Sequence, residues 1–506
     1  MQPSIIHSLV PPLVVLVPLA GGVLAGLFGG LGHRVRVGIV GVACVATTLL
    51  VLSLLPAILD GGHVHSGTLS LMPGVKLFLR ADAMGTLFAS TLCGLFLLSF
   101  AYATGHLRDD VRPGRYFTFF MLCQACMLGV AFAGNLLTLL VFYELFSLLV
   151  YPLVVHEQTP EAWRAGTKYI VYILIGGSLV LVGVVFTVFL AGDHPFTPGG
   201  FLRGGLDRGL VLAAFWCLIA GFGVKAALMP LHGWVPDVHP AAPAPFSALL
   251  SGVMVAAGAF GILRVVFEVF GIGTARALGV MPWLSLIAAI SVLVAAVLAV
   301  GERNIKRRLA WSTISQMAYV ALAVSLLAEQ VTVGALVHIT HHAFLKGALF
   351  LGAGLLASKA GIRTVEQMDG AARRMPITMA AFAVAAFGMT GVPPLSGFVS
   401  KWLLGLGALQ AGQSWVLAVL LGGALLSAIY LWPLLYAAYF HDGPPAEADG
   451  QSPKHGSRRE RESPFGMLAA LIMASALSVL LGLGAAVPGG PVSLARLAAA
   501  AFFSVE

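Results

Sequence analysis

Long apolar runs separated by short polar segments cover almost the whole chain. A helix that crosses a membrane needs about 20 mainly apolar residues. By this measure the sequence predicts fourteen membrane-spanning helices, at approximately residues 5–28, 37–59, 83–104, 116–133, 136–155, 168–190, 209–229, 247–268, 281–301, 309–327, 332–357, 377–407, 415–440 and 465–486. The pattern therefore predicts an all-α polytopic membrane protein, with residues 1–506 forming a single membrane domain.

Two of these runs have special features. Residues 5–27 follow no basic segment, so we interpret them as a retained first helix and not as a cleaved signal peptide. Residues 377–407 are too long and too rich in proline and glycine for one continuous helix.

The composition agrees with this pattern and excludes several classes of protein for this chain. Of the 506 residues, 59% are apolar and 10% are charged, whereas soluble domains carry roughly a quarter charged residues. A soluble enzyme, a disordered chain and a disulfide-stapled secreted module are therefore excluded. The net charge of +8 in so apolar a chain is better explained by the orientation of membrane loops than by nucleic-acid binding.

The five cysteines all lie in apolar runs, and an odd number does not suit a disulfide framework. Cys123 and Cys126 have the spacing of a redox pair or of half a metal site. Because no Cys or His pair of matching spacing accompanies them, we favour a packing role and predict no metal site.

The basic residues indicate how the chain is oriented. One set of alternating loops holds nineteen of the 29 Lys and Arg residues, the other set holds six, and four lie within spans. Loops rich in Lys and Arg stay on the cytoplasmic side. The bias predicts an even number of spans in a bacterial inner membrane, with both termini outside.

Polar segments divide the domain further. Residues 441–464 mix Pro, Gly, Ser and both charge signs, which favours a flexible cytoplasmic loop, with a docking segment for a partner as the alternative. Residues 60–81 alternate apolar and polar positions and predict a small external hairpin. We divide the remainder into a three-helix segment (1–115), two five-helix units (116–268 and 281–440) and a C-terminal helix and tail (465–506).

Four charged residues lie deep within predicted spans. Glu144 is the only acidic one, and Lys225, Lys346 and Lys401 are the basic ones. Each such group costs about 2.5–3.5 kcal/mol at a helix centre, which calls for a functional explanation. A lysine that extends to the membrane interface is the alternative, and Lys401 suits it best.

Two histidines share a helix face with one of these lysines. His338, His342 and Lys346 are spaced i, i+4 and i+8, while His341 lies about 100° around the helix from His342. A neutral imidazole can both accept and donate a proton. The spacing therefore predicts a proton relay.

Prolines interrupt two of the spans. Pro230 follows Lys225, and Pro393 and Pro394 precede Lys401. Broken helices at corresponding positions of two halves indicate an inverted-repeat transporter. Spans 4–8 and 9–13 form two five-helix units whose fourth member is broken, and an odd number of helices per unit makes the second unit inverted.

Several motifs resemble the antiporter-like subunit superfamily. They are FYELFSL, GFGVKAALMPLHGWVPDVHPAAPAPFSALLSG, ERNIKRRLAWSTISQMAYV, HHAFLKGALFLGAG and GVPPLSGFVSKW. Members of this superfamily include the large membrane subunits of respiratory complex I (NADH:quinone oxidoreductase), the A and D subunits of Mrp-type Na⁺/H⁺ antiporters, and membrane subunits of energy-converting hydrogenases. The resemblance covers nearly the whole chain and is greatest to the Mrp D or hydrogenase type.

The resemblance implies a proton path along a polar axis at mid-membrane. Glu144 and Lys225 match the family's paired residues of the fifth and seventh helices, and Lys401 matches the exit-side lysine of the twelfth. One departure is that many relatives carry a Lys or His in the eighth helix, where this chain has Ala256 or Ala257. Water or a neighbouring histidine bridges this interval, or the subunit transports protons poorly.

We therefore expect a proton-translocating subunit of a multisubunit membrane complex. A Na⁺/H⁺ antiporter subunit of the Mrp D type is the first alternative, and a mainly structural membrane subunit is the second. No haem, flavin or iron–sulfur motif is present, so we expect no cofactor, and any redox chemistry belongs to partner subunits. The expected partners are other membrane subunits, the lipid bilayer, H⁺ and, for the antiporter, Na⁺.

One charged pair is expected to stand outside this path. Arg264 and Glu268 are one helical turn apart near the outer end of the eighth span. The spacing predicts an ordinary helix ion pair that contributes little to transport.

Overall fold

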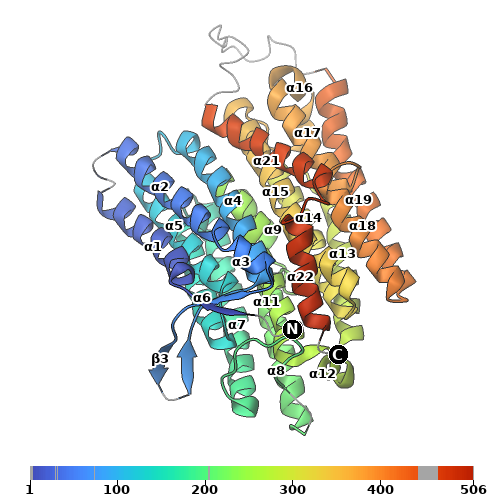
Figure 1. The fold of residues 1–506 in the computed structure, drawn as a ribbon. Helices are drawn as coiled ribbons and strands as arrows, with labels where there is room; N and C mark the ends of the chain where they lie inside the picture. Colours follow the sequence, from blue (N-terminus) through green and yellow to red (C-terminus); the bar gives the residue numbers. More distant parts are fainter. Residues whose placement is uncertain are drawn as a thin grey trace.

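The computed structural model describes residues 4–28, 30, 32–72, 74–202, 205–442 and 465–504. It is a bundle of helices with a few short strands at one end (Figure 1). The loop predicted for residues 441–464 lies almost wholly outside the described residues.

The first part of the chain combines helices with the strands. The helices are α1 (Val10–Phe28), α2 (His33–Leu52), α3 (Leu55–Leu59) and α4 (Ala83–His106). The strands are β1 (Ile5–His7), β2 (His63–His65), β3 (Leu69–Met72), β4 (Val75–Leu77) and β5 (Arg80–Ala81). Strand β2 pairs in parallel with β1 and antiparallel with β5, while β3 and β4 form the hairpin predicted between residues 60 and 81.

The first predicted span is shorter than expected. Residues 5–7 form strand β1, which pairs with β2, and helix α1 begins at Val10. Apolar character alone did not reveal that the backbone of Ile5–His7 belongs to the sheet.

The next part of the chain contains the first break. Its helices are α5 (Pro113–Ala131), α6 (Leu136–Val154), α7 (Pro160–Ala191), α8 (Arg208–Lys225) and α9 (Val235–Ala241). A long segment follows, made of α10 (Ala244–Leu249), π-helix η2 (Leu250–Met254), α11 (Ala256–Arg264), π-helix η3 (Val265–Phe270) and α12 (Gly271–Leu278). Helix α8 ends at Lys225, five residues before Pro230, so the predicted break is present.

The following part contains the second break. Its helices are α13 (Met281–Gly301), α14 (Ile305–Ser325), α15 (Glu329–Ala360), the short η4 (Val365–Met368) and α16 (Ala371–Arg374), α17 (Pro376–Thr390), α18 (Ser396–Gln410) and α19 (Ser414–Phe440). Pro393 and Pro394 separate α17 from α18, which confirms that residues 377–407 are not one helix. The described chain ends with α21 (Phe465–Leu483) and α22 (Pro491–Phe503).

Each of the fourteen predicted spans coincides with a helix or a broken helix. Within the described residues, twelve helices are long and apolar enough to cross a membrane. The other two predicted spans are α14, which buries polar side chains such as Ser312 and Gln316 inside the bundle, and the broken pair α17–α18. Helix α22, of 13 residues, lies in the C-terminal tail that follows the last predicted span.

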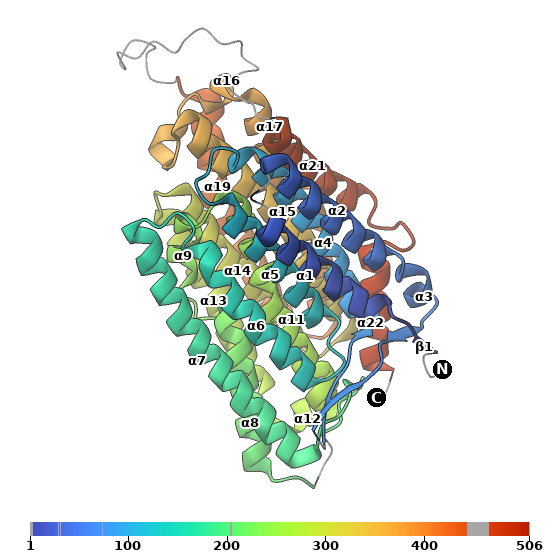
Figure 2. The same ribbon diagram turned by 90° about the vertical axis from the view of Figure 1, so that its left-hand side faces the viewer.

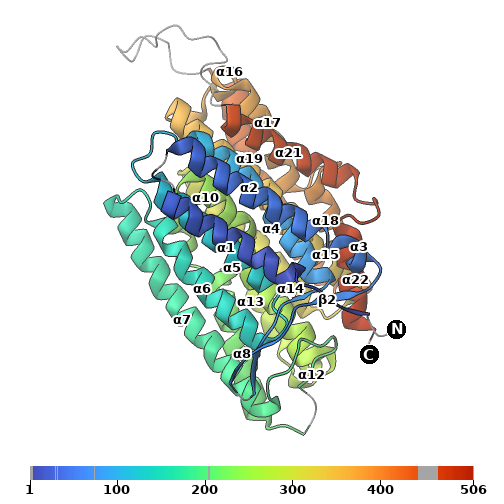
Figure 3. The same cartoon turned by 60° about the vertical axis from the view of Figure 1, so that its left-hand side comes forward.

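Helix α15 lies at the centre of the bundle. It packs against α4, α10, α14, α17, α18, α21 and α22. Figure 1 shows α1, α2 and α5 at one edge and α18 and α19 at the other, and Figure 3 shows α1 and α2 lying over α5 and α4. In Figure 2, β1 and α22 lie at the same end of the bundle. The relay face predicted on α15 is therefore enclosed by protein.

Candidate functional site

Lys225 is buried at the point where helix α8 stops. Its ammonium donates a hydrogen bond of 2.5 Å to the Ser147 hydroxyl of α6 and lies 4.0 Å from the centre of the Phe146 ring. Two residues later, Ala227 has a φ of +59°, a conformation that costs a non-glycine residue about 1–3 kcal/mol. Strain of this kind is concentrated at functional sites, and here it lies beside a buried cation.

Glu144 precedes Ser147 by three residues on α6, but its carboxylate lies against α7. A Cβ atom added at Gly177 of α7 would lie 2.4 Å from Glu144 Oε1, which is buried and without a hydrogen-bond partner in the described structure. The sequence pairs Glu144 with Lys225. In the structure the hydrogen bond of the Lys225 ammonium goes to the Ser147 hydroxyl, which lies about one turn along α6 from Glu144.

Replacing Gly177 by Ala should displace the Glu144 carboxylate. A displacement of about 1 Å in a reacting group can reduce a rate by up to about 10²-fold, and we expect proton transport to fall about tenfold with assembly retained. Proton uptake by membrane vesicles measures this. Gly38→Ala on α2 is the matched control, because a Cβ there meets nothing within 4 Å. Equal transport by both variants would contradict the assigned position of the carboxylate.

Lys346 of α15 is fully buried against α14. Its ammonium donates to the Ser312 hydroxyl at 2.7 Å and to the Leu309 carbonyl at 2.8 Å. The Tyr430 hydroxyl of α19 donates to the same Ser312 hydroxyl at 2.7 Å and lies 3.1 Å from Ser427 Oγ. Like Lys225, Lys346 therefore rests on a serine hydroxyl.

The two predicted histidines follow Lys346 along α15. The ring centres of His342 and His338 are 6.0 Å apart, and both side chains are buried. His338 Nδ1 forms a 3.0 Å hydrogen bond with the Ser400 hydroxyl of α18. His338 Nε2 and both nitrogens of His342 have no protein partner in the described structure. Buried polar atoms of this kind usually bind water, so the face of α15 can carry hydrogen-bonded water.

Lys401 lies next to Ser400 at the second break. Its ammonium donates at 2.5 Å to the carbonyl of Met389, in the last turn of α17. Helix α17 ends with Gly391 at a φ of +97°, the left-handed conformation common just after a helix. A cation at the carboxyl end of a helix is stabilised by the helix dipole. The side chain is thus turned to the helix break, which argues against an extension to the membrane interface.

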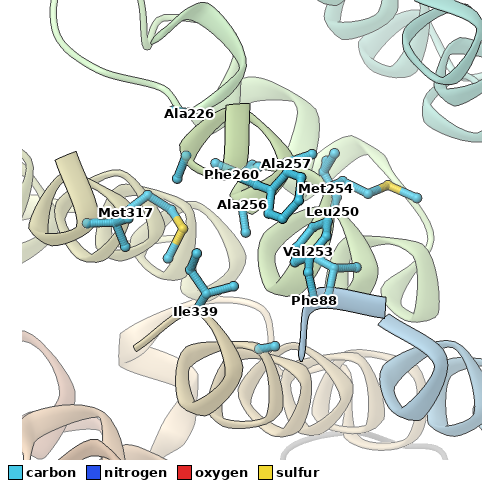
Figure 4. Packing of buried hydrophobic residues seen from close by; sticks show 14 of the residues in the cluster. Phe88, Ala226, Leu250, Val253, Met254, Ala256, Ala257, Phe260, Met317 and Ile339 are labelled. Carbon is cyan, nitrogen blue, oxygen red and sulfur yellow. The ribbon is translucent and has the colours of Figure 1, made fainter. Parts of the chain in front are cut away.

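The interval between the two lysine sites is apolar. Ala256 and Ala257 occupy the positions where relatives were expected to carry Lys or His. Figure 4 shows the buried side chains around them, including those of Ala226, Met254, Phe260, Met317 and Ile339. The aligned positions therefore offer no titratable link between Lys225 and Lys346.

A cavity of about 880 Å³ is present among the predicted cytoplasmic loops. It is lined by backbone and side chains from α7, α9, α14, α15 and the segment before α10. Its charged members include Glu157, Lys168, Asp237, Lys306 and Arg363. A cavity with so many charged side chains is suited to hold water.

The pair formed by Arg264 and Glu268 is part of a larger buried cluster. Arg264 Nη1 donates to Glu268 and, at 2.7 Å, to Asp82, while Arg80 Nη2 donates to Glu268 at 2.9 Å and to Asp82 at 3.0 Å. All four side chains are buried. The prediction of an ion pair is confirmed, but its description as an ordinary helix pair is wrong, because Arg80 and Asp82 join it from the other side.

Sequence reasoning missed the hydroxyl groups around the relay residues. Ser147 and Ser312 accept from Lys225 and Lys346, Tyr430 donates to Ser312, and Ser400 bonds to His338. Only Ser147 and Ser400 lie near a predicted relay residue in the chain. Cys123 and Cys126 are buried and form no disulfide. Among the described residues, no group of three or more His, Cys, Asp or Glu side chains is placed to hold a metal ion.

Known proteins resemble the chain in sequence and in fold. A family model described as NADH:quinone oxidoreductase/Mrp antiporter, transmembrane region, matches residues 133–427. NADH-quinone oxidoreductase subunit N of Desulforudis audaxviator is 33% identical over 94% of this chain and 95% of its own length. Hydrogenase-4 component B of Escherichia coli is 31% identical over 81% of this chain and 62% of its own length.

A solved structure shows the same fold. A chain of the Mrp complex from Dietzia sp. superposes with a TM-score of 0.82 at 22% identity, over 98% of this chain and 97% of that chain. At this level of identity the likeness concerns the fold alone.

Proposed function

The chain belongs to the NADH:quinone oxidoreductase/Mrp antiporter family of multi-pass membrane proteins, and we propose that it is a proton-translocating subunit of a multisubunit membrane complex. One observation carries this proposal. Lys225 and Lys346 are buried in the bundle, and each donates to a serine hydroxyl, with no carboxylate among the described residues forming an ion pair with it. A buried lysine without a counter-ion is costly to keep charged, so it can release and regain a proton during a cycle.

We assign the roles as follows. Glu144 and Lys225 form a switch, because their approach favours both charged forms and their separation favours both neutral forms. Lys346, His342 and His338 pass the proton along α15, and Lys401 releases it toward the outer side. Pro230, Pro393 and Pro394 break the two helices so that polar backbone reaches the path. No redox step takes place in this subunit.

We further propose that residues 116–268 and 281–440 are inverted repeats. Supporting this, each unit has a broken helix in the fourth position, α8–α9 in one and α17–α18 in the other. The excess of Lys and Arg in one set of loops supports a bacterial inner membrane location with both termini outside. The named relatives and the Mrp complex support other membrane subunits as partners.

A cation/H⁺ antiporter subunit of the Mrp D type is the second candidate, favoured by the fold of the Mrp complex. A structural membrane subunit is favoured only by the apolar layer at Ala256 and Ala257.

Ion transport by vesicles tests the proposed function. Membrane vesicles that contain the whole complex are placed in a buffer without Na⁺, and a membrane potential is imposed on them. The internal pH is followed with a dye. We expect proton flux that is lost in membranes lacking this subunit alone. A requirement for added Na⁺ would identify the antiporter, and equal flux with and without the subunit would overturn proton translocation.

A further inference from the structure

Lys346 has a polar connection that does not lead toward Lys225. The Leu309 carbonyl of α14, which accepts from Lys346, also accepts from the Thr313 hydroxyl at 3.0 Å. The Thr313 hydroxyl in turn forms a 2.6 Å hydrogen bond with the Ser251 hydroxyl. Ser251 lies in the π-helix η2, and all of these side chains are buried. The hydroxyl pair Ser251–Thr313 thus connects η2, which lies in the eighth predicted span (247–268), to the surroundings of Lys346.

The same span continues toward the cytoplasmic cavity. Ser247 is four residues before Ser251, so the two lie on the same side of the helix about 5–6 Å apart. The Ser247 hydroxyl lies 3.2 Å from the Ala242 carbonyl, which also accepts from the Lys306 ammonium at 3.0 Å. Ala242 and Lys306 both line the cavity. The line of hydroxyl groups therefore begins at the wall of the cavity.

Room for water is indicated beside this line. His239 is fully buried, and neither of its ring nitrogens has a hydrogen-bond partner in the described structure. Its backbone carbonyl lies 2.9 Å from the Ser247 hydroxyl. A buried imidazole without a protein partner usually binds water, and one water is long enough to bridge the interval between the Ser247 and Ser251 hydroxyls.

We propose that Ser247, Ser251 and Thr313 form a proton-entry line that loads Lys346 directly from the cytoplasmic cavity, in place of the missing basic residue of the eighth helix. The inference rests on the proposed function and adds to it the route of entry. A proton from cavity water is taken up by the Ser247 hydroxyl as that hydroxyl releases its own proton inward. The same exchange follows at Ser251 and Thr313. Because the Leu309 carbonyl between Thr313 and Lys346 has no proton to pass on, a water beside it takes the proton from Thr313 and gives one of its own to the neutral Lys346 amine. Each hydroxyl ends with the single proton it had at the start.

This route separates entry from the Glu144–Lys225 switch. Gly258 of the same span packs directly on Ala226 and Phe222, next to Lys225. Along the span, the buried apolar residues 253–257 separate Gly258 from Ser251. Protons on the entry line therefore need not cross the layer. The switch then acts on Lys346 by charge alone.

Thr313→Val and Thr313→Ser, in the intact complex, test the entry line. Valine keeps the shape of threonine without its hydroxyl, whereas serine keeps the hydroxyl. With an imposed membrane potential, we expect proton flux to fall about tenfold or more in Thr313→Val and in Ser251→Ala, and Thr313→Ser to retain at least about half. Assembly is checked on native gels.

Ser285→Ala is the matched control. Ser285 and Ser325 form a buried hydroxyl pair of the same 2.6 Å length away from the line, so this variant should keep the wild-type flux. Wild-type flux in assembled Thr313→Val and Ser251→Ala would overturn the entry line and leave proton translocation standing. Absence of subunit-dependent flux in the wild type would overturn the proposed function itself.

Discussion

Lys225→Ala should abolish proton pumping driven by the complex's own energy source, while the complex still assembles. Removal of the ammonium leaves the Glu144 carboxylate without its cation, which favours the protonated carboxyl group and stops the switch. Glu144→Ala should have the same effect, because it removes the carboxylate that is the other member of the switch. We expect pumping to fall at least about 10²-fold in both variants, measured as ΔpH formation in vesicles, with assembly checked on native gels.

The conservative variant Lys225→Arg distinguishes the need for a positive charge at this position from the need for a group that can release its proton. Lys225→Arg keeps a cation near Ser147, but a guanidinium stays protonated at every physiological pH, so only part of the pumping should return. Lys359→Ala is the control, because Lys359 lies exposed in the last turn of α15. Full pumping by Lys225→Ala would refute the switch and favour a structural subunit.

The sequence was sufficient to predict the helices, the two breaks and the buried charged residues. Those predictions rest on signals within one segment: an apolar run, a proline, or a lysine where hydrocarbon is expected. The face of α15 that carries His338, His342 and Lys346 follows from spacing alone. Predictions from such local signals do not require knowledge of which helices are neighbours in the fold.

The partners of the lysines could not be predicted in the same way. Ser312 and Tyr430 belong to helices α14 and α19, and only the fold brings them to Lys346. Serine and threonine are common in membrane helices, where they bond to backbone as readily as to a lysine. The hydroxyl pair Ser251–Thr313 is equally invisible, since its members are 62 residues apart.

The cluster around Arg264 is a second case in which contacts between residues distant in the sequence could not be predicted. Arg264 and Glu268 predict a pair because they are four residues apart, but Asp82 is 182 residues away and is placed by the start of α4. There it also caps the helix, since its carboxylate accepts from the Gly85 N–H at 2.8 Å. The pair Arg264–Glu268, which the sequence presents as an ordinary helix pair, is therefore part of a buried connection between strand β5, helix α4 and the eighth predicted span.

Arg264→Ala should destabilise the protein strongly. It leaves Asp82 and Glu268 with one arginine, Arg80, to balance two buried carboxylates, and removal of one partner from a buried ion pair costs about 3–5 kcal/mol. Thermal unfolding of the purified complex should occur at a lower temperature, and less complex should assemble. Transport per assembled complex should stay close to wild type, because the cluster lies outside the proposed path.

The double variant Arg264→Met/Glu268→Leu distinguishes charge balance from lost packing. It removes one charge of each sign and leaves Arg80 paired with Asp82 at 3.0 Å. Replacement of a buried pair by apolar side chains is often neutral, so the double variant should be more stable than Arg264→Ala alone. If Arg264→Ala melted like the wild type, the cluster would not hold the outer end together. If it assembled fully and lost transport, the exit path would lie through Arg264, contrary to the assignment of Lys401.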